Sequence, residues 1–395
     1  MKPGPVPGES GPALPPAMLG VMGGGQLARM FVHAAQAMGY GTAVLDPDPH
    51  SPAGSVSHLH VATAYDDEQG LAELAQHCVA LTTEFENVPA PALARLAERR
   101  PVAPGATAVA ICQQRDAEKA HFERADVPVA PYAVIAAAAD LHAVDASLFP
   151  ALLKTVRLGY DGKGQVAVAT PEALASAWAQ LRQVPCVLER RLALRQEISV
   201  VVARGADGAW VHLPVQQNLH REGILAVTQV PAPDIEAALA AQAVAWAHRV
   251  AAAMDYVGVL CVEFFVLQDG SLVANEMAPR PHNSGHYSID ACDVSQFELQ
   301  VRCMAGLPLV PPRQHSAAVM LNLLGDLWFD GVDDHPKNPP WQRVLALPGV
   351  HLHLYGKAEA RRGRKMGHLT VAATDAATAR SVALQAAALL GLPAF

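Results

Sequence analysis

Residues 257–277 read VGVLCVEFFVLQDGSLVANEM, the most informative stretch for the architecture of the chain. Its first half is apolar apart from Glu263, which is typical of a strand that is buried on both faces. Asp269-Gly270 is a strong signal for a two-residue turn. The stretch therefore predicts a β-hairpin whose return strand runs from Ser271 to Met277.

The register of this hairpin predicts two opposed carboxylates. With a two-residue turn, Gln268 faces Ser271, and counting outward puts Glu263 directly opposite Glu276. Opposed residues have Cβ atoms about 4.5 to 5.5 Å apart, where like charges repel each other. Mg²⁺ binds a couple of carboxylates together with nucleotide phosphates, and it would remove this repulsion. Glu263 and Glu276 are the predicted metal ligands; the alternatives are one protonated glutamate or a solvated sheet face.

N-terminal to the hairpin, the chain predicts a parallel sheet. The strand candidate Met18–Met22 precedes Gly23-Gly24-Gly25-Gln26, a helical stretch and a second strand candidate, which is the order of a βαβ unit. The turn fits the G-x-G-x-x-A pattern, so an NAD-dependent dehydrogenase is open on this motif alone. A later strand candidate is followed by Glu84 and Glu86, and functional residues gather beyond the carboxyl ends of such strands.

A glycine-rich segment follows Lys154, which ends an apolar strand candidate. The segment is Gly159-Tyr160-Asp161-Gly162-Lys163-Gly164-Gln165. Its glycines allow backbone N–H groups to approach phosphate closely, and we expect Lys163 to follow the phosphates of a ligand as the segment closes over them as a lid. It matches neither the P-loop nor the protein-kinase glycine loop, which disfavours both folds. A plain turn between strands is the alternative.

Near the C-terminus lies a cluster that we call the basic tract, which consists of Lys357, Arg361, Arg362, Arg364 and Lys365. In a chain of net charge -8, this local reversal suits a phosphate monoester, which arginine binds bidentately. A solvated surface turn is the alternative. His351 and His353 precede the tract at strand spacing, and we expect them on a polar sheet face rather than at a metal.

Length and composition limit the class of protein. A chain of 395 residues predicts two or three domains, and 51% hydrophobic with 17% charged residues is a globular composition. The negative net charge argues against binding to nucleic acid or acidic membranes. Six cysteines without a C-x-x-C pair indicate free thiols in a reducing cytoplasm. Residues 1–16 lack the apolar core of a signal peptide, so a flexible extension and a cytoplasmic, soluble protein are expected.

Five motifs occur in a fixed order along the chain. They are GGQL (24–27), TEFEN (83–87), GYDGKGQ (159–165), NEMAPRPHNSGH (275–286) and GRKMGHL (363–369). This series resembles the 5-(carboxyamino)imidazole ribonucleotide synthases of the ATP-grasp superfamily, and the resemblance covers nearly the whole chain after the N-terminal extension.

The resemblance implies an α/β fold with a three-domain ATP-grasp architecture. Its parts would be the extension (1–16), a Rossmann-like domain (17–112), an ATP-grasp domain (113–310) and a small strand-rich domain (311–395). The implied substrates are ATP, bicarbonate and 5-aminoimidazole ribonucleotide, with Mg²⁺, or alternatively Mn²⁺, as the metal. Bicarbonate would be phosphorylated to carboxyphosphate and then captured by the amine, in de novo purine (IMP) synthesis. A homodimer is implied in the same way.

The resemblance also implies roles for individual residues. Those implied for ATP are Arg115, Lys154, Gly159, Tyr160, Asp161, Gly162, Lys163, Gly164, Gln165, Glu189, Arg190, Arg191, Leu192, Glu197, His220, Asn275 and Glu276. Those implied for the carboxylation chemistry are Tyr160, Asp161, Arg280 and His282. Those implied for the ribonucleotide are Gln26, Leu27, Glu84, Asn283, Ser284, Lys357, Arg364 and Lys365. Strict strand alternation, however, points the Asn275 side chain away from Glu276.

Two departures from the family pattern stand out. Arg190-Arg191 is more basic than the usual aromatic-containing linker, and the gap from Lys357 to Arg361 is one residue longer, which leaves the phosphate-binding arginine undecided between Arg361 and Arg362. Three rivals are weighed against the resemblance. A formate-using glycinamide ribonucleotide transformylase would not carry the Asn-Ser-Gly-His stretch, a dehydrogenase has no use for opposed glutamates, and an inactive binding module would not keep the metal and lysine positions.

Overall fold

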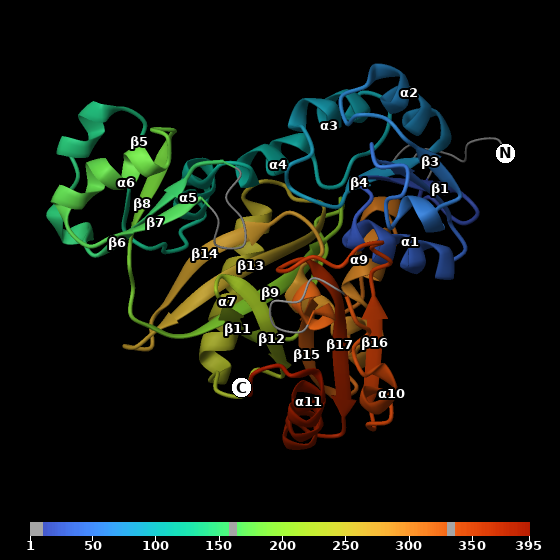
Figure 1. The fold of residues 1–395 in the computed structure, drawn as a ribbon. Helices are drawn as coiled ribbons and strands as arrows, with labels where there is room; N and C mark the ends of the chain where they lie inside the picture. The colour runs from blue at the N-terminus through green and yellow to red at the C-terminus, as the bar shows by residue number, and fades with distance from the viewer. Residues whose placement is uncertain (1–10, 158–163, 330–335) are drawn as a thin grey trace.

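The computed structural model describes residues 11–157, 164–329 and 336–395. Figure 1 shows a blue N-terminal sheet, a green lobe on the opposite side, and a large sheet between them that runs from yellow to red. The architecture is the expected α/β arrangement of one parallel sheet followed by antiparallel sheets. Within the described residues, no helix is long and apolar enough to cross a bilayer.

The N-terminal sheet is parallel, with strand order β3-β2-β1-β4. Its strands are β1 (Met18–Met22), β2 (Gly41–Leu45), β3 (Leu59–Val61) and β4 (Ala80–Thr83). The accompanying helices are α1 (Gln26–Ala37), α2 (Glu68–His77), α3 (Ala90–Ala97) and α4 (Ala106–Cys112). β1 lies between β2 and β4, so the glycine turn after β1 and the glutamates after β4 emerge at neighbouring positions on one sheet edge.

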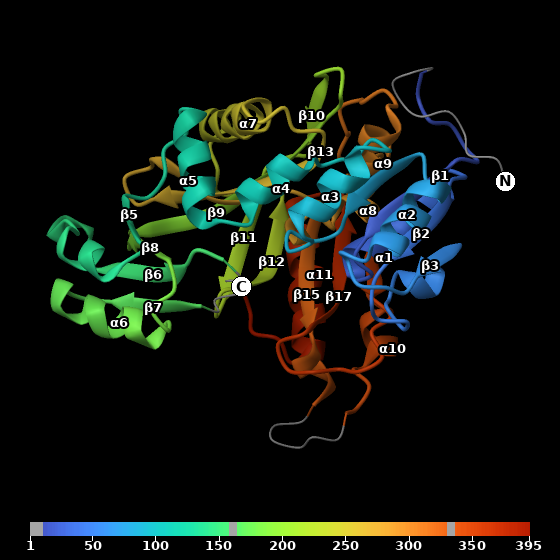
Figure 2. The same cartoon turned by 90° about the horizontal axis from the view of Figure 1, so that it is seen from above.

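The green lobe is a small antiparallel sheet with order β5-β8-β6-β7. Its elements are β5 (Tyr132–Ile135), β6 (Ala151–Thr155), β7 (Gln165–Val168), α6 (Leu174–Gln180) and β8 (Cys186–Arg190). Trp178 of α6 packs with Leu153 and Leu188 in a core of its own. Helices α4 and α5 (Arg115–Arg124) link this lobe to the N-terminal sheet (Figure 2).

The large sheet has the order β14-β13-β9-β11-β12-β15-β17-β16, with β10 paired to β9. Its strands are β9 (Leu194–Arg204), β10 (Trp210–His212), β11 (Gln216–Arg221), β12 (Ile224–Val230), β13 (Gly258–Leu267), β14 (Leu272–Ala278), β15 (Ala317–Leu324), β16 (Val350–Leu354) and β17 (Lys365–Ala373). The helices are α7 (Ala237–Ala252), α8 (Ser288–Ala291), α9 (Gln296–Ala305), α10 (Trp341–Val344) and α11 (Ala376–Leu390). Because β12 pairs with β15, the sheet continues across residue 310 without a break.

Part of the expected flexible extension is packed. Ala13 is buried, its N–H donates to the Ala305 carbonyl at 2.8 Å, and its own carbonyl accepts from the Tyr40 hydroxyl at 2.7 Å. Ala13 is thus anchored in the apolar core that contains residues of α1 and α9, while its neighbours Pro12 and Leu14 are exposed. The six cysteines, all in the described part of the chain, are free thiols as expected.

Candidate active site

A cavity of about 470 Å³ lies at the junction of the three sheets. Its lining includes Lys154 and Gln165 from the green lobe, Glu86 from the N-terminal sheet, and Lys365 from the large sheet. The other predicted site residues in the lining are Arg115, Glu197, His220, Glu263, Asn275, Glu276, Arg280, His282 and Asn283. A larger cavity of about 770 Å³, between Trp210 of β10 and α7, is lined mainly by apolar side chains. The smaller cavity therefore holds the chemistry.

The β13–β14 hairpin pairs Glu263 with Glu276, as the sequence predicts. The route to this pairing differs from the prediction. Leu267 N–H donates to the Ser271 carbonyl at 2.8 Å, so three residues form the turn, not two. A bulge then lets Asn275 intervene, since Phe264 pairs with Ala274 while Glu263 pairs with Glu276. The two one-residue departures cancel each other.

The bulge also bears on Asn275. Strict alternation would turn this side chain away from Glu276, but a bulged strand breaks the alternation locally. Residues 275–278 all line the cavity, so Asn275 lies at its wall beside Glu276.

Glu197, Glu263 and Glu276, which we call the acidic cluster, are held by basic neighbours. Glu263 Oε1 lies 2.9 Å from His282 Nε2, and His220 Nδ1 lies 2.7 Å from Glu197 Oε2. Burial would raise the pKa of Glu263, but the charge and hydrogen bond of His282 hold it well below its usual range. Glu263 is therefore an ionised, buried carboxylate.

The acidic cluster fits a divalent cation. Glu263 supplies an ionised oxygen pair with a side chain only 10% exposed, whereas the opposed Glu276 is 46% exposed toward the cavity. Oxygen ligands of this kind suit Mg²⁺, which also needs room for phosphate and water. Glu197, His220 and Glu263 additionally bring three ligand atoms within 4.8 Å of one another.

Two buried lysines share one glutamate on the green-lobe side of the cavity. Lys154 Nζ lies 3.1 Å from Glu189 Oε2, and Lys119 Nζ lies 3.3 Å from Glu189 Oε1. Burial would raise the pKa of Glu189, but these lysines lower it. Lys119 is a residue that the sequence reasoning missed. Its position one helical turn after Arg115 on α5 is the signal that could have identified it.

The predicted adenine linker lies apart from the cavity lining. The Arg190 N–H donates to the Pro131 carbonyl at 2.9 Å, and the Arg191 N–H donates to the Pro150 carbonyl at 2.8 Å. Of the described residues 189–192, none contributes to the lining of the 470 Å³ cavity. Two backbone N–H groups of the linker are thus already used in hydrogen bonds within the protein.

Arg280 forms an ion pair with Glu86, a residue that the sequence analysis placed after a strand without giving it a role. Its Nε lies 2.6 Å from Glu86 Oε2. Burial would raise the pKa of Glu86, but the charge of Arg280 lowers it to about 2. The guanidinium is therefore held at the cavity by an ionised carboxylate from the N-terminal sheet. Tyr160 and Asp161, predicted to act beside Arg280, lie outside the described residues, as do Gly159, Gly162 and Lys163.

The glycine turn after β1 binds carboxylates of its own chain. Gly25 N–H donates to Glu84 Oε1 at 2.5 Å, Ala28 N–H donates to Oε2 at 3.0 Å, and Gly24 N–H donates to Asp46 Oδ2 at 2.7 Å. A helix N-terminus attracts anions, and here Glu84 takes that place. A Cβ at Gly25 would lie 2.4 Å from Glu84 Oε1, so glycine is needed for this approach. The turn therefore does not present free N–H groups to a dinucleotide, which removes the dehydrogenase reading.

Two members of the basic tract donate to main-chain oxygens. Lys357 Nζ donates to the Lys365 carbonyl at 2.5 Å, and Arg364 donates to the Glu359 carbonyl at 2.9 Å. Burial, with Arg364 nearby, lowers the pKa of Lys357 to about 8. Arg361 pairs with Glu359 at 2.8 Å, and Arg362 lies over the Phe329 ring.

Only part of the predicted ribonucleotide set shares the 470 Å³ cavity. Asn283 and Lys365 line it, whereas Lys357 lines a neighbouring cavity of about 590 Å³. Ser284 is fully buried beneath the floor. Gln26 and Leu27 begin α1, beside the turn that holds Glu84.

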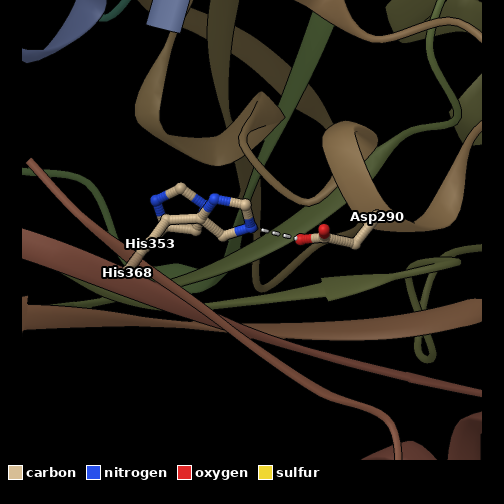
Figure 3. Close-up of side chains that lie close together, drawn as sticks. All are labelled: Asp290, His353 and His368. Carbon is tan, nitrogen blue, oxygen red and sulfur yellow. Dashed lines mark hydrogen bonds and ion pairs between the residues drawn. The ribbon is translucent and has the colours of Figure 1, made fainter. Parts of the chain in front are cut away.

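His353 lies beside a second cluster of ligand-type side chains, with Asp290 and His368 (Figure 3). His353 Nε2 is 2.8 Å from Asp290 Oδ2. The rings of His353 and His368 stack with centroids 4.5 Å apart and planes 12° from parallel. Two nearly parallel stacked rings do not aim nitrogens at one ion, so this arrangement joins β16 to α8 and does not form a metal site. His351, expected on a polar face, lies 3.7 Å from the same aspartate.

Comparisons with known proteins agree with this architecture. Residues 17–113 match the ribonucleotide synthetase preATP-grasp domain, residues 120–297 match the ATP-grasp domain, and residues 318–382 match the phosphoribosylaminoimidazole carboxylase C-terminal domain. The fold and the site thus define an ATP-grasp enzyme.

Relatives specify the family. The chain is 43% identical to the N5-carboxyaminoimidazole ribonucleotide synthase of Brucella melitensis, covering 90% of this chain and 96% of that protein. It is 40% identical to the enzyme of the same name from Pseudomonas aeruginosa, covering 94% and 99%. A crystal structure of an ADP complex of such a synthetase superposes with a TM-score of 0.88 at 37% identity, covering 95% and 97%. The chain belongs to the N5-carboxyaminoimidazole ribonucleotide synthase family.

Proposed function

We infer that the chain joins bicarbonate to 5-aminoimidazole ribonucleotide at the expense of ATP, giving 5-(carboxyamino)imidazole ribonucleotide, ADP and phosphate in de novo purine synthesis. The family membership supports this activity. A related structure from Aspergillus clavatus contains ADP together with 5-aminoimidazole ribonucleotide, at 29% identity and a TM-score of 0.85, covering 95% of this chain and 98% of that one. The observation that carries the inference is the opposed pair Glu263 and Glu276, in a cavity that also contains Arg280 and Lys365.

The first half-reaction uses the acidic side of the cavity. A bicarbonate oxygen attacks the γ-phosphorus of ATP, the bond to the bridging oxygen breaks, and ADP leaves. We assign Arg115 and Lys154 to the ATP phosphates, and Glu197 and His220 to the nucleoside side. Mg²⁺, held by Glu263 and Glu276, would supply charge neutralisation for the phosphates. Most of the catalysis then comes from positioning and electrostatics.

The second half-reaction forms the new C–N bond. The amine of the ribonucleotide attacks the carbon of carboxyphosphate, the C–O bond to the phosphoryl group breaks, and phosphate leaves. We assign Arg280, which Glu86 holds at 2.6 Å, to the stabilisation of negative charge on the acyl phosphate. We assign His282 to the same step, and Tyr160 and Asp161 remain proposed partners there. Gln26, Leu27, Glu84, Asn283 and the basic tract are assigned to the ribonucleotide side, whereas Ser284, fully buried, is not retained there.

The test is a release assay for ADP in which each substrate is omitted in turn. The proposed function requires that carbamate formation depends on ATP, bicarbonate and aminoimidazole ribonucleotide together. Turnover with formate in place of bicarbonate, or with glycinamide ribonucleotide as the amine, would instead indicate the transformylase branch of the superfamily. ADP release without any dependence on an amine would contradict both.

We further propose a homodimer in the cytoplasm, with functional parts that span residues 17–112, 113–310 and 311–395. The family supports these assignments, and the three domain matches lie close to the proposed limits. Sedimentation equilibrium at several concentrations tests the dimer, because a monomer across the micromolar range would contradict it. Limited proteolysis, with and without Mg-ATP, tests the parts and the predicted closure of the 159–165 segment.

A further inference from the structure

The hydroxyl of Ser199 is the centre of a buried polar group beneath the cavity. Ser199 lies on β9, with Glu263 as its neighbour on β13 and Gln216 as its neighbour on β11. Its Oγ lies 2.8 Å from Ser284 Oγ, 2.8 Å from Asn218 Nδ2 and 3.0 Å from Gln216 Oε1. Ser199, Ser284 and Gln216 are fully buried. A buried hydroxyl with three polar contacts costs more to remove than an exposed one, because its partners are left unsatisfied.

This group reaches the acidic cluster through two side chains. Ser284 Oγ lies 2.9 Å from His282 Nδ1, and His282 Nε2 lies 2.9 Å from Glu263 Oε1. The order Ser199, Ser284, His282, Glu263 thus joins the middle of the large sheet to a proposed metal ligand. Each link is within normal hydrogen-bond distance.

The main chain of His282 is fixed independently. Its N–H donates to Gln296 Oε1 at 2.8 Å, and its carbonyl accepts from Gln296 Nε2 at 2.7 Å. A Cβ at Gly285 would lie 2.4 Å from the same Gln296 Oε1, which explains the glycine in Asn-Ser-Gly-His. With the backbone held by Gln296, the remaining freedom of His282 is the rotation of its ring. Ser284 contacts the ring at Nδ1, and the Cys261 thiol, 3.9 Å from Ser284 Oγ, contacts the ring as well.

Counting hydrogens shows that the ring orientation does not depend on a detail of the network. A serine hydroxyl has one hydrogen, so Ser199 donates either to Gln216 or to Ser284. If Ser199 donates to Gln216, Ser284 donates to Ser199 and His282 Nδ1 donates to Ser284. The other arrangement, in which Ser199 donates to Ser284 and Nδ1 accepts from Ser284 Oγ, needs a neutral ring, whereas the charge of His282 beside Glu263 requires both ring nitrogens to donate. In both cases, Nε2–H donates to Glu263, because an ionised carboxylate only accepts.

We propose that Ser199 is a positioning residue which, through Ser284 and His282, sets the orientation of the Glu263 carboxylate for the divalent cation of ATP. Partners behind a metal ligand orient it, and their loss typically lowers metal affinity or activity about 10- to 100-fold. The proposal rests on the proposed function for its kinetic consequences. Its structural core, the coupling of Ser199 to the His282 ring, is independent of that function.

The alternative is that Ser199 only stabilises the sheet, and Thr228 provides the comparison that separates the two roles. Thr228 Oγ1 donates to Asn218 Oδ1 at 2.9 Å and is equally buried, but it lies two hydrogen bonds from Ser199. Ser199→Ala and Thr228→Val each remove one buried hydroxyl. A purely structural role predicts similar effects of the two changes, whereas positioning predicts an effect that falls along the chain of bonds. Thr370→Val is the matched control, since this buried hydroxyl in the same sheet lacks a hydrogen-bond partner among the described residues.

The first experiment measures steady-state kinetics beside the urea midpoint of each variant. Ser199→Ala should raise the KM for Mg-ATP about 10-fold or more and leave the KM for the ribonucleotide within about twofold. Thr228→Val should raise the KM for Mg-ATP by less than about threefold, and Thr370→Val should leave it unchanged. Equal kinetic effects of Ser199→Ala and Thr228→Val, at equal loss of stability, would overturn the proposal.

The second experiment observes His282 in the nucleotide-free and metal-free protein by ¹⁵N-histidine NMR, with the signal assigned from its loss in His282→Gln. The Nε2–H signal should be protected from exchange in the wild type and Thr370→Val, and lost or broadened in Ser199→Ala. A signal that is unchanged in Ser199→Ala overturns the proposal, even if the enzyme proves to carboxylate another substrate. If Ser199→Ala does not fold, Ser199→Cys keeps the shape with a weaker hydrogen bond. It should then show the same changes to a smaller degree, and an unchanged signal contradicts the proposal equally.

Discussion

The acidic cluster is the proposed cation site and the basic tract is the proposed phosphate site. Their side chains are held in opposite ways. The acidic cluster lies on β9, β13 and β14 of the large sheet, where Glu263 and Glu197 already contact histidines at 2.9 and 2.7 Å. The basic tract lies in the turn between β16 and β17, where its cations contact main-chain oxygens or an exposed glutamate. The first is built before any ligand arrives. For the phosphate binding proposed above, the basic tract would exchange contacts with its own chain for contacts with the phosphate.

The comparison shows what determines the binding energy at each of the two regions. Preorganised carboxylates lose little freedom when a cation binds, so their contribution depends on orientation. Flexible lysines and arginines lose side-chain entropy, and their contribution depends on how many charge-assisted hydrogen bonds replace the contacts they leave. Changes in the acidic cluster should therefore affect turnover and the KM for Mg-ATP, and changes in the basic tract should affect the KM for the ribonucleotide.

The largest expected effect is that of Glu263→Gln. Removing this charge should lower carbamate formation about 10³-fold, because the proposed cation site loses its buried ligand. Glu276→Gln should act in the same direction. Glu68→Gln, at an exposed glutamate that pairs only with the exposed Arg95 among its described neighbours, is the matched control. Product formation and circular dichroism are the measurements. Turnover within about 10-fold of wild type would contradict the role of Glu263 as a cation ligand.

Next in size is Arg364→Ala in the basic tract. An arginine–phosphate contact contributes about 1.5 to 3 kcal/mol, so the KM for the ribonucleotide should rise about 10- to 100-fold. The KM for ATP should stay within about twofold. Arg361→Ala is the comparison variant in the same tract, because this guanidinium is 70% exposed and already paired with Glu359. Steady-state kinetics with each substrate varied are the measurement. Equal changes in both KM values would place the tract at the ATP side.

A smaller effect is expected from pH at the same tract. Burial lowers the pKa of Lys357 to about 8, below its usual value of 10.5. Lys357 is therefore charged below pH 8 and loses its proton as the pH rises through that value. The kcat/KM for the ribonucleotide should fall by several-fold between about pH 7 and 9, since this ratio reports the free enzyme. Lys357→Arg should remove the fall, and an unchanged profile in that variant would assign the titration to another group.

The smallest kinetic effect is expected for Glu118→Gln, a buried neighbour of the acidic cluster. Glu118 Oε1 accepts from the Met277 N–H at 2.6 Å, and burial together with Glu276 raises the pKa of Glu118 to about 8. The folded state holds a proton there between about pH 4.5 and 8, so the wild type should lose stability as the pH rises through this window. Glu118→Gln should flatten that dependence, with turnover within about threefold. Urea midpoints at pH 5 and 8 decide it; parallel curves would refute the assignment.

The sequence predicted the fold and the opposed pair Glu263 and Glu276 for reasons that can be traced to particular residues. A hairpin with one charged residue in each apolar strand has few registers, so Glu263 and Glu276 could be paired by counting. The three-residue turn and the bulge at Asn275 could not be found from the sequence. Around Phe264 and Ala274, successive residues on both faces of the strands are apolar, so there is no apolar–polar alternation that would reveal a shift. The turn and the bulge each shift the pairing by one residue in opposite directions, so the simple count still paired Glu263 with Glu276.

The contacts of the site were less accessible to sequence reasoning. Glu86 and Arg280 are 194 positions apart, and Ser199 and Ser284 are 85 positions apart. Such pairs are brought together by the crossing of strands, and their spacing along the chain has no period to detect. The glycine turn shows the same limit. Its glycines were visible, but the reason for them, the carboxylate of Glu84 at the start of α1, depends on how β1 and β4 pair.

The continuous ladder from β14 to β16 restricts how the polypeptide can be divided. Val227 on β12 pairs with Leu321 on β15, and both belong to one apolar core with Leu369 and Ala383. A fragment that ends near residue 310 would leave β12 as an open edge, and a fragment that begins there would expose β15 in the same way. Open edges recruit other chains and favour aggregation. Truncated versions should therefore be insoluble, and the central and C-terminal parts should melt as one cooperative unit.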